Sequence, residues 1–198
     1  MPKGGPIEVG MIKFLMQNDC KADENGGPGH GLDVPGMLKY RNEYRERVQM
    51  LPFDQSRKRK VVIRRHAVGQ DLVRVYVQGA PEEVVKLCNF TLNDRDERVA
   101  LTADDKGALL GTVGEMAASK EIAGGLKVFS YAFKDMEAAE LDKQLEMLKR
   151  LQMPAEESED FRAEIEKDLI YLSTFGLEDP LHDDVLRAVE YIAYGHPD

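Results

Sequence analysis

A run of basic residues follows a phenylalanine and forms the densest positive charge in the sequence. Phe53 comes first, and the cations after it are Arg57, Lys58, Arg59, Lys60, Arg64 and Arg65. An aromatic ring can stack on a base and cations attract phosphates, so this segment could bind a nucleotide. Basic runs are also typical of solvated faces, nucleic-acid patches and localisation signals, and Phe53 could be a core residue at a strand start. In an extended strand, Lys58 and Lys60 would share one face and Arg57 and Arg59 the other.

The composition indicates a folded acidic protein rather than a nucleic-acid binder. The 198 residues suit one domain, or one domain with part of a second, and 42% hydrophobic residues suffice for a core. The net charge of −9 argues against general binding to nucleic acid. The apolar run 9–16 is interrupted by Lys13 and is too short to span a bilayer, and no signal peptide is apparent.

No metal site is expected. Cys20 and Cys88 lie in unrelated contexts, which disfavours a disulfide framework and fits a reducing cytosol. None of the four histidines has a metal-ligand spacing, and all are expected to be exposed: they are His30, His66, His182 and His196.

Hydrophobic periodicity and turn residues predict an α+β fold, in which a twisted antiparallel β-sheet is flanked by helices. The early part is predicted to contain a short helix at 9–17, a surface loop at 17–36 and an amphipathic helix at 37–48. A hairpin of strands 60–64 and 71–77 follows, then a helix from Pro81 to Cys88. The remaining predicted elements are helix 108–120, strand 126–133, helices 137–152 and 161–167, strand 168–175 and helix 183–193.

Several segments, in order along the chain, resemble the nucleotide-binding domain of type II P-type cation-transporting ATPases, the calcium-pump-like branch. They are G-G-P-I-E-V-G-M at 4–11, L-P-F-D-Q-S-R-K-R-K-V-V at 51–62, Q-G-A-P-E-E-V-V at 78–85 and G-L-K-V-F-S-Y-A-F at 125–133. A last segment, G-L-E-D-P-L-H-D-D-V at 176–185, resembles the family's hinge. Each match alone is weak, but their common order is a strong signal.

The resemblance implies a set of nucleotide-binding residues. Phe53 would stack on adenine, Glu8 would accept a hydrogen bond from its amine, and Lys58 would approach the triphosphate. Gly79 and Ala80 would let the backbone approach the ligand closely.

Two positions depart from the family and are expected to weaken binding. Gln78 replaces the lysine of the K-G-A-P-E signature, which keeps a donor but removes the charge. Lys127 stands where arginine is common, which keeps the charge but loses the bidentate fork.

The resemblance also implies a domain organisation, with the nucleotide-binding domain at 1–175 and the hinge and start of the phosphorylation domain at 176–198. Asp179 and Pro180 would be hinge residues. The D-K-T-G-T, T-G-E-S and T-G-D segments of the family are absent from this sequence. The chain is therefore expected to be a monomeric piece of an integral membrane pump, on the cytosolic face of the membrane and not itself embedded. Its partners would be ATP, with Mg²⁺ in the intact pump, and the phosphorylation and actuator domains.

Without the phosphorylated Asp, the chain alone should bind ATP and not hydrolyse it, so no catalytic residue is assigned. One alternative is a haloacid-dehalogenase-type phosphotransferase, but the D-x-D spacing of Asp94 and Asp96 lies in a polar, turn-like stretch. A second alternative is a regulatory or interaction module that kept the fold and lost nucleotide binding. The resemblance implies that the parent protein pumps cations across a membrane, with calcium as the expected ion.

Overall fold

The computed structural model describes residues 46–65, 71–118 and 125–178, together with positions 11, 14, 185, 189 and 192. The predicted loop 17–36 lies outside these residues. Of the predicted helices 9–17 and 183–193, only Met11, Phe14, Val185, Val189 and Ile192 are described, and all of them are helical.

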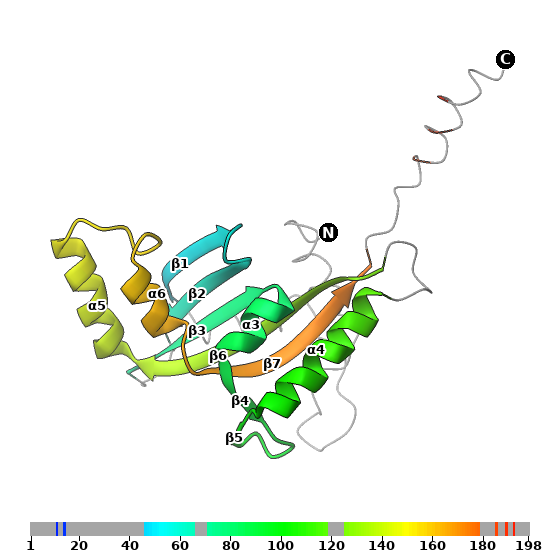
Figure 1. Ribbon diagram of the computed structural model, residues 1–198. Coiled ribbons are helices and arrows are strands. Elements are labelled where there is room, and N and C mark those ends of the chain that lie inside the picture. Colours follow the sequence, from blue (N-terminus) through cyan, green and yellow to red (C-terminus); the bar gives the residue numbers. More distant parts are fainter. Residues whose placement is uncertain are drawn as a thin grey trace.

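The described residues form a seven-stranded sheet with helices over one face (Figure 1). The strands are β1 (Glu46–Asp54), β2 (Arg59–Arg65), β3 (Leu72–Gly79), β4 (Cys88–Leu92), β5 (Arg98–Ala100), β6 (Lys127–Glu137) and β7 (Leu169–Leu177). The helices are α3 (Pro81–Leu87), α4 (Ala103–Ala117), α5 (Ala138–Arg150) and α6 (Glu159–Ile165). The strand order across the sheet is β1-β2-β3-β6-β7-β4-β5.

The predicted fold class, an α+β sheet flanked by helices, is confirmed. The hairpin predicted from strands 60–64 and 71–77 corresponds to β2 and β3, which pair antiparallel with Lys60 opposite Gln78. The sheet is mixed, however, because β4 and β7 run parallel. These two strands are separated by β5, β6 and the helices between them, so no hairpin constrains their direction.

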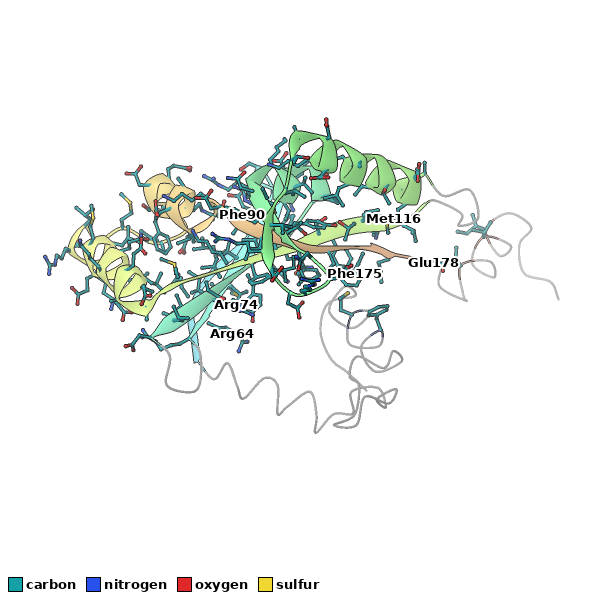
Figure 2. The ribbon with its side chains drawn as sticks, turned by 90° about the horizontal axis from the view of Figure 1, so that it is seen from below. Arg64, Arg74, Phe90, Met116, Phe175 and Glu178 are labelled. Atoms are coloured by element: carbon teal, nitrogen blue, oxygen red, sulfur yellow. The ribbon has the colours of Figure 1, made fainter. Side chains whose placement is uncertain are left out.

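Alternating burial along β2 and β3 defines the two faces of the sheet. Val61, Ile63, Val73, Val75 and Val77 are fully buried toward the helices, and they share one core with Leu141, Phe161, Ile165 and Leu169. In Figure 2, the helices lie on one side of the sheet, while Arg64, Arg74 and Phe175 lie on the other. The second side is called the helix-free face below.

The structure corrects two predictions and contains two further strands that were not predicted. The end of the predicted helix 37–48 lies in β1, an edge strand that buries Leu51 and leaves Met50 and Phe53 exposed. Helix α4 begins at Ala103 rather than 108, because Thr102 and Asp105 form a reciprocal capping box. Strands β4 and β5 were not predicted. They are short, and β4 is held by pairing with the distant β7.

The solvent face of α4 carries three glycines whose replacement should stabilise the protein. A Cβ atom added at Gly107, Gly111 or Gly114 would meet no atom within 4 Å. Each Gly→Ala change is expected to raise the free energy of unfolding by about 0.5–1 kcal/mol, because alanine restricts the unfolded chain and favours helix. Urea unfolding followed by circular dichroism would measure this.

Gly125→Ala provides the control with the opposite sign. Gly125 has a φ of 71°, and a Cβ there would lie 2.1 Å from the carbonyl oxygen of Ala117. This variant should be destabilised. A loss of stability in the α4 variants would show that the glycines face a contact rather than solvent.

Candidate functional site

A pocket of about 540 Å³ opens on the helix-free face, at the end of the sheet where β2 begins and β3 ends. It contains all the predicted nucleotide-binding residues except Glu8, which lies outside the described residues together with Asp179 and Pro180. Its lining residues are Phe53, Gln55, Lys58, Lys60, Gln78, Gly79, Ala80, Lys127, Val128 and Phe129. Segments far apart in the sequence therefore meet in one pocket.

The turn between β1 and β2 is shaped by Asp54. Its carboxylate accepts hydrogen bonds from the Ser56 backbone N–H at 2.8 Å, the Ser56 hydroxyl at 2.7 Å and the Arg57 backbone N–H at 3.2 Å. The Ser56 hydroxyl bond and these two backbone bonds lower the pKa of Asp54 to about 2. The turn ends at Lys58, which has a φ of 50° and whose N–H donates to the Asp54 carbonyl at 2.7 Å. The ionised Asp54 thus folds the turn that presents Lys58 to the pocket.

Gly79 makes a close packing contact within the protein, in addition to the ligand approach that the resemblance implies. A Cβ atom at Gly79 would lie 2.4 Å from the carbonyl oxygen of Lys58 and 2.5 Å from Cβ of Arg59. The same Lys58 carbonyl accepts a hydrogen bond from the Ala80 N–H at 2.9 Å. The missing side chain therefore lets the β1–β2 turn pack against the end of β3. This close contact is within the protein and does not require a ligand.

The cations of the basic run separate by face, as the predicted alternation requires. Lys58 and Lys60 line the pocket, whereas Arg57 and Arg59 pair with Glu159 and Glu166 on the opposite side. Lys58 lies in the turn rather than in a strand, so its direction comes from the turn geometry. Its ammonium lies 3.3 Å from the Glu82 carboxylate, and both side chains are about half exposed. Such an exposed ion pair contributes about 0–1 kcal/mol, so a ligand could displace it.

A buried ion triad lies beneath the turn, on the helix side of the sheet. The Glu166 carboxylate accepts hydrogen bonds from both Arg59 and Arg162, and all three residues are at least nine-tenths buried. Arg59 also donates to the Arg57 carbonyl at 3.1 Å, and Arg162 donates to the Glu156 carbonyl at 3.0 Å. The triad joins the start of β2 to α6 and so supports the pocket from behind.

Phe53 is not a core residue, because 52% of its surface is exposed at the end of β1. On the β6 side the pocket is bounded by Phe129, whose ring stacks on Phe175 at a centroid distance of 6.1 Å. Phe175 in turn meets Phe14 edge-to-face at 5.6 Å. Figure 2 shows Phe175 on the helix-free face. The pocket therefore has an exposed ring on one side and a fixed aromatic cluster on the other.

Sequence reasoning missed several lining residues, of which Lys60 is the most significant. It is directly opposite Gln78 in the sheet and points to the same face. The strand alternation that grouped Lys58 with Lys60 was the signal that could have identified it. Among the described residues, three lysines line the pocket, namely Lys58, Lys60 and Lys127, and no carboxylate does.

The other reactive groups among the described residues lie away from the pocket. Cys88 is buried, and burial raises the pKa of its thiol to about 12, so it is not a nucleophile at neutral pH. Asp94 and Asp96 are exposed in the turn between β4 and β5. Within the described ranges, no group of His, Cys, Asp and Glu could hold a metal ion. No helix in the described part of the chain is long and apolar enough to cross a membrane.

A larger hollow, of about 690 Å³, lies between α5, the segment 152–156 and the edge strand β1. It contains none of the predicted site residues, and its charged groups have both signs: Asp142, Glu146, Lys149 and Glu156. Volume alone therefore does not identify the site. The smaller pocket combines an aromatic platform with charged groups that are all positive.

The chain belongs to the family described as "P-type ATPase, cytoplasmic domain N", whose pattern it matches over residues 3–184. This match covers the whole sheet and the pocket.

Among curated relatives, the chain is similar to calcium-transporting ATPase 2, endoplasmic reticulum-type, of Arabidopsis thaliana. The two are 30% identical over 152 residues, which is 75% of this chain and 13% of that protein. It is also 26% identical to the calcium-transporting ATPase PAT1 of Dictyostelium discoideum over 189 residues, or 94% of this chain and 14% of the relative. A calcium-transporting ATPase of Plasmodium falciparum is 26% identical over 153 residues, covering 77% of this chain and 11% of the relative. The chain thus spans a small part of each relative.

Proposed function

We propose that this domain binds ATP in the pocket on the helix-free face, as the nucleotide-binding part of a cation-transporting P-type ATPase. The proposal is supported by the convergence on one pocket of Phe53 from β1, Lys58 from the β1–β2 turn, Gln78 from β3 and Lys127 from β6. A pocket of about 540 Å³ has the size of typical small-molecule sites.

The pocket offers the chemistry that a nucleotide needs. The exposed ring of Phe53 provides a platform for the adenine base. Lys58 and Lys127 lie at the sheet edge, where their charges would attract the phosphates, and a triphosphate would take Lys58 from its weak pair with Glu82. The domain's contribution would be positioning and electrostatics.

The phosphoryl acceptor would come from another domain of the pump. No carboxylate lines the pocket among the described residues, which agrees with an aspartate nucleophile supplied from outside. We propose that residues 176–198, with Asp179 and Pro180, form the hinge and the start of that phosphorylation domain. ATP would carry Mg²⁺ in the intact pump, and the relatives' calcium transport makes calcium the proposed cargo of the parent protein.

A regulatory module without nucleotide binding is the second candidate, and the neutral Gln78 favours it. The two candidates differ in one measurement, the calorimetric titration of the chain with ATP. Saturable binding supports the nucleotide site, and its absence supports the regulatory module.

Phe53→Ala should weaken the binding of ATP, ADP and AMP to a similar extent, because all three share the base. Loss of a stacked ring costs about 1–3 kcal/mol, or roughly 5- to 150-fold in Kd. Calorimetry with the three nucleotides would measure it. Stability should change little, since Phe53 is half exposed.

Met50→Ala is the matched control for this substitution. Met50 is also an exposed apolar residue of β1, at 43%, but it does not line the pocket. This variant should bind ATP like the wild-type chain. Equal affinity of the Phe53→Ala and wild-type chains would remove Phe53 from the site.

A further inference from the structure

We infer that Lys60 is an additional nucleotide-binding residue, which supplies the positive charge on the pocket floor where Gln78 is neutral. This inference rests on the proposed ATP site. It starts from the register of β2 and β3, in which Lys60 and Gln78 are direct partners.

The register fixes where the two side chains lie. Facing residues in an antiparallel pair have Cβ atoms about 4.5–5.5 Å apart and point to the same side of the sheet. Arg59 and Val61, the residues before and after Lys60, are buried on the helix side. Lys60 therefore faces the pocket. A positive charge on Lys60 therefore lies near the same part of the pocket as a charge at position 78 would.

The position of Lys60 differs from those of the other two lysines. Lys58 belongs to the turn. Gly79 ends β3 and pairs with Ser130, so Lys127, which comes earlier in the antiparallel strand β6, lies beyond the end of β3. Lys60 lies one residue farther into the sheet than Gly79, whose partner is Arg59. It is half-buried, whereas Lys58 and Lys127 are exposed. Water screens a half-buried charge less, so Lys60 should interact with an anionic ligand more strongly per unit of charge.

The contacts of Arg59 hold the backbone from which Lys60 extends. The preceding guanidinium is fixed in the triad with Glu166 and Arg162, and its backbone packs against Gly79. The start of β2 is therefore rigid, and Lys60 extends from a fixed backbone. The backbone position of Lys60 is therefore preorganised.

The test is a charge exchange between the two partners. Lys60→Met should weaken ATP binding about fivefold or more, with a smaller loss for ADP and the smallest for AMP, because the effect scales with ligand charge. Lys60→Arg should retain affinity. Gln78→Lys alone should change ATP affinity less than twofold, because two facing lysines repel each other. In the Lys60→Met background, the same change should restore affinity to within about twofold of wild type.

Lys143→Met is the control for loss of one lysine, since Lys143 lies exposed on α5 and does not line the pocket. Calorimetry at two salt concentrations gives the affinities, and thermal unfolding establishes that each variant is folded. If the wild-type chain binds ATP and the Lys60→Met variant binds it equally tightly, the inference is overturned and the proposed ATP site stands. An equal loss for ATP, ADP and AMP, or no rescue by Gln78→Lys, would also overturn it. A wild-type chain without saturable binding would overturn both proposals.

Discussion

Replacing Glu166 with alanine should lower the free energy of unfolding by about 3–5 kcal/mol, because the change leaves two buried guanidinium groups without a counter-charge. Arg59 is 8% exposed and Arg162 2% exposed, and both donate to the Glu166 carboxylate. Urea unfolding of the variant and wild-type chains would measure the difference.

Two further variants separate the charge effect from simple loss of contact. Glu164→Ala removes a carboxylate of α6 whose partner Lys167 is exposed, and it should cost less than about 1 kcal/mol. Replacing Arg59, Arg162 and Glu166 together with apolar residues of similar size should recover most of the lost stability. A cost below about 1 kcal/mol for Glu166→Ala would mean that water reaches the triad.

Gly79→Ala should reduce both stability and ATP affinity, even though the change adds one methyl group. The new Cβ would overlap the Lys58 carbonyl and Cβ of Arg59, at 2.4 and 2.5 Å, and backbone atoms there cannot simply rotate away. Overpacking of this kind costs about 1–3 kcal/mol. The turn must move outward, which breaks the hydrogen bond from the Ala80 N–H and displaces Lys58. We expect ATP to bind at least about tenfold more weakly.

Gly107→Ala is the matched control, because it makes the same substitution at an open position of α4. It should leave ATP affinity unchanged. If Gly79→Ala bound ATP as tightly as wild type, the position of the β1–β2 turn would not matter to the site.

Six of the ten lining residues were predicted, because they lie in short segments that resemble the family's motifs. The basic run leads into β2, the Q-G-A-P-E segment joins β3 to α3, and Gly125 shortly precedes β6. Lys58 and Lys60 lie apart from Arg57 and Arg59, as strand alternation predicted, although Arg57 and Lys58 belong to the turn before β2.

The missed features depend on contacts between distant residues. Arg59 and Glu166 are 107 positions apart, and no local pattern links them. Strand β4 follows α3 without a break and becomes a strand through its pairing with β7. The packing role of Gly79 depends on the turn that folds against it, so the sequence suggested only backbone freedom.

The place of β7 in the sheet has a consequence for the order of folding. It is the last described strand in the chain, yet it lies between β6 and β4 and joins two groups of strands. During synthesis, β1, β2, β3 and β6 can pair before residue 169 exists, but β4 and β5 cannot join them. Until then, the core residues Val84, Val85 and Cys88 lack part of their cover. The pairing of β4 with β7 closes a long loop of intervening chain, and closure of a long loop is slow. The growing chain therefore passes through a stage at which it is prone to aggregation.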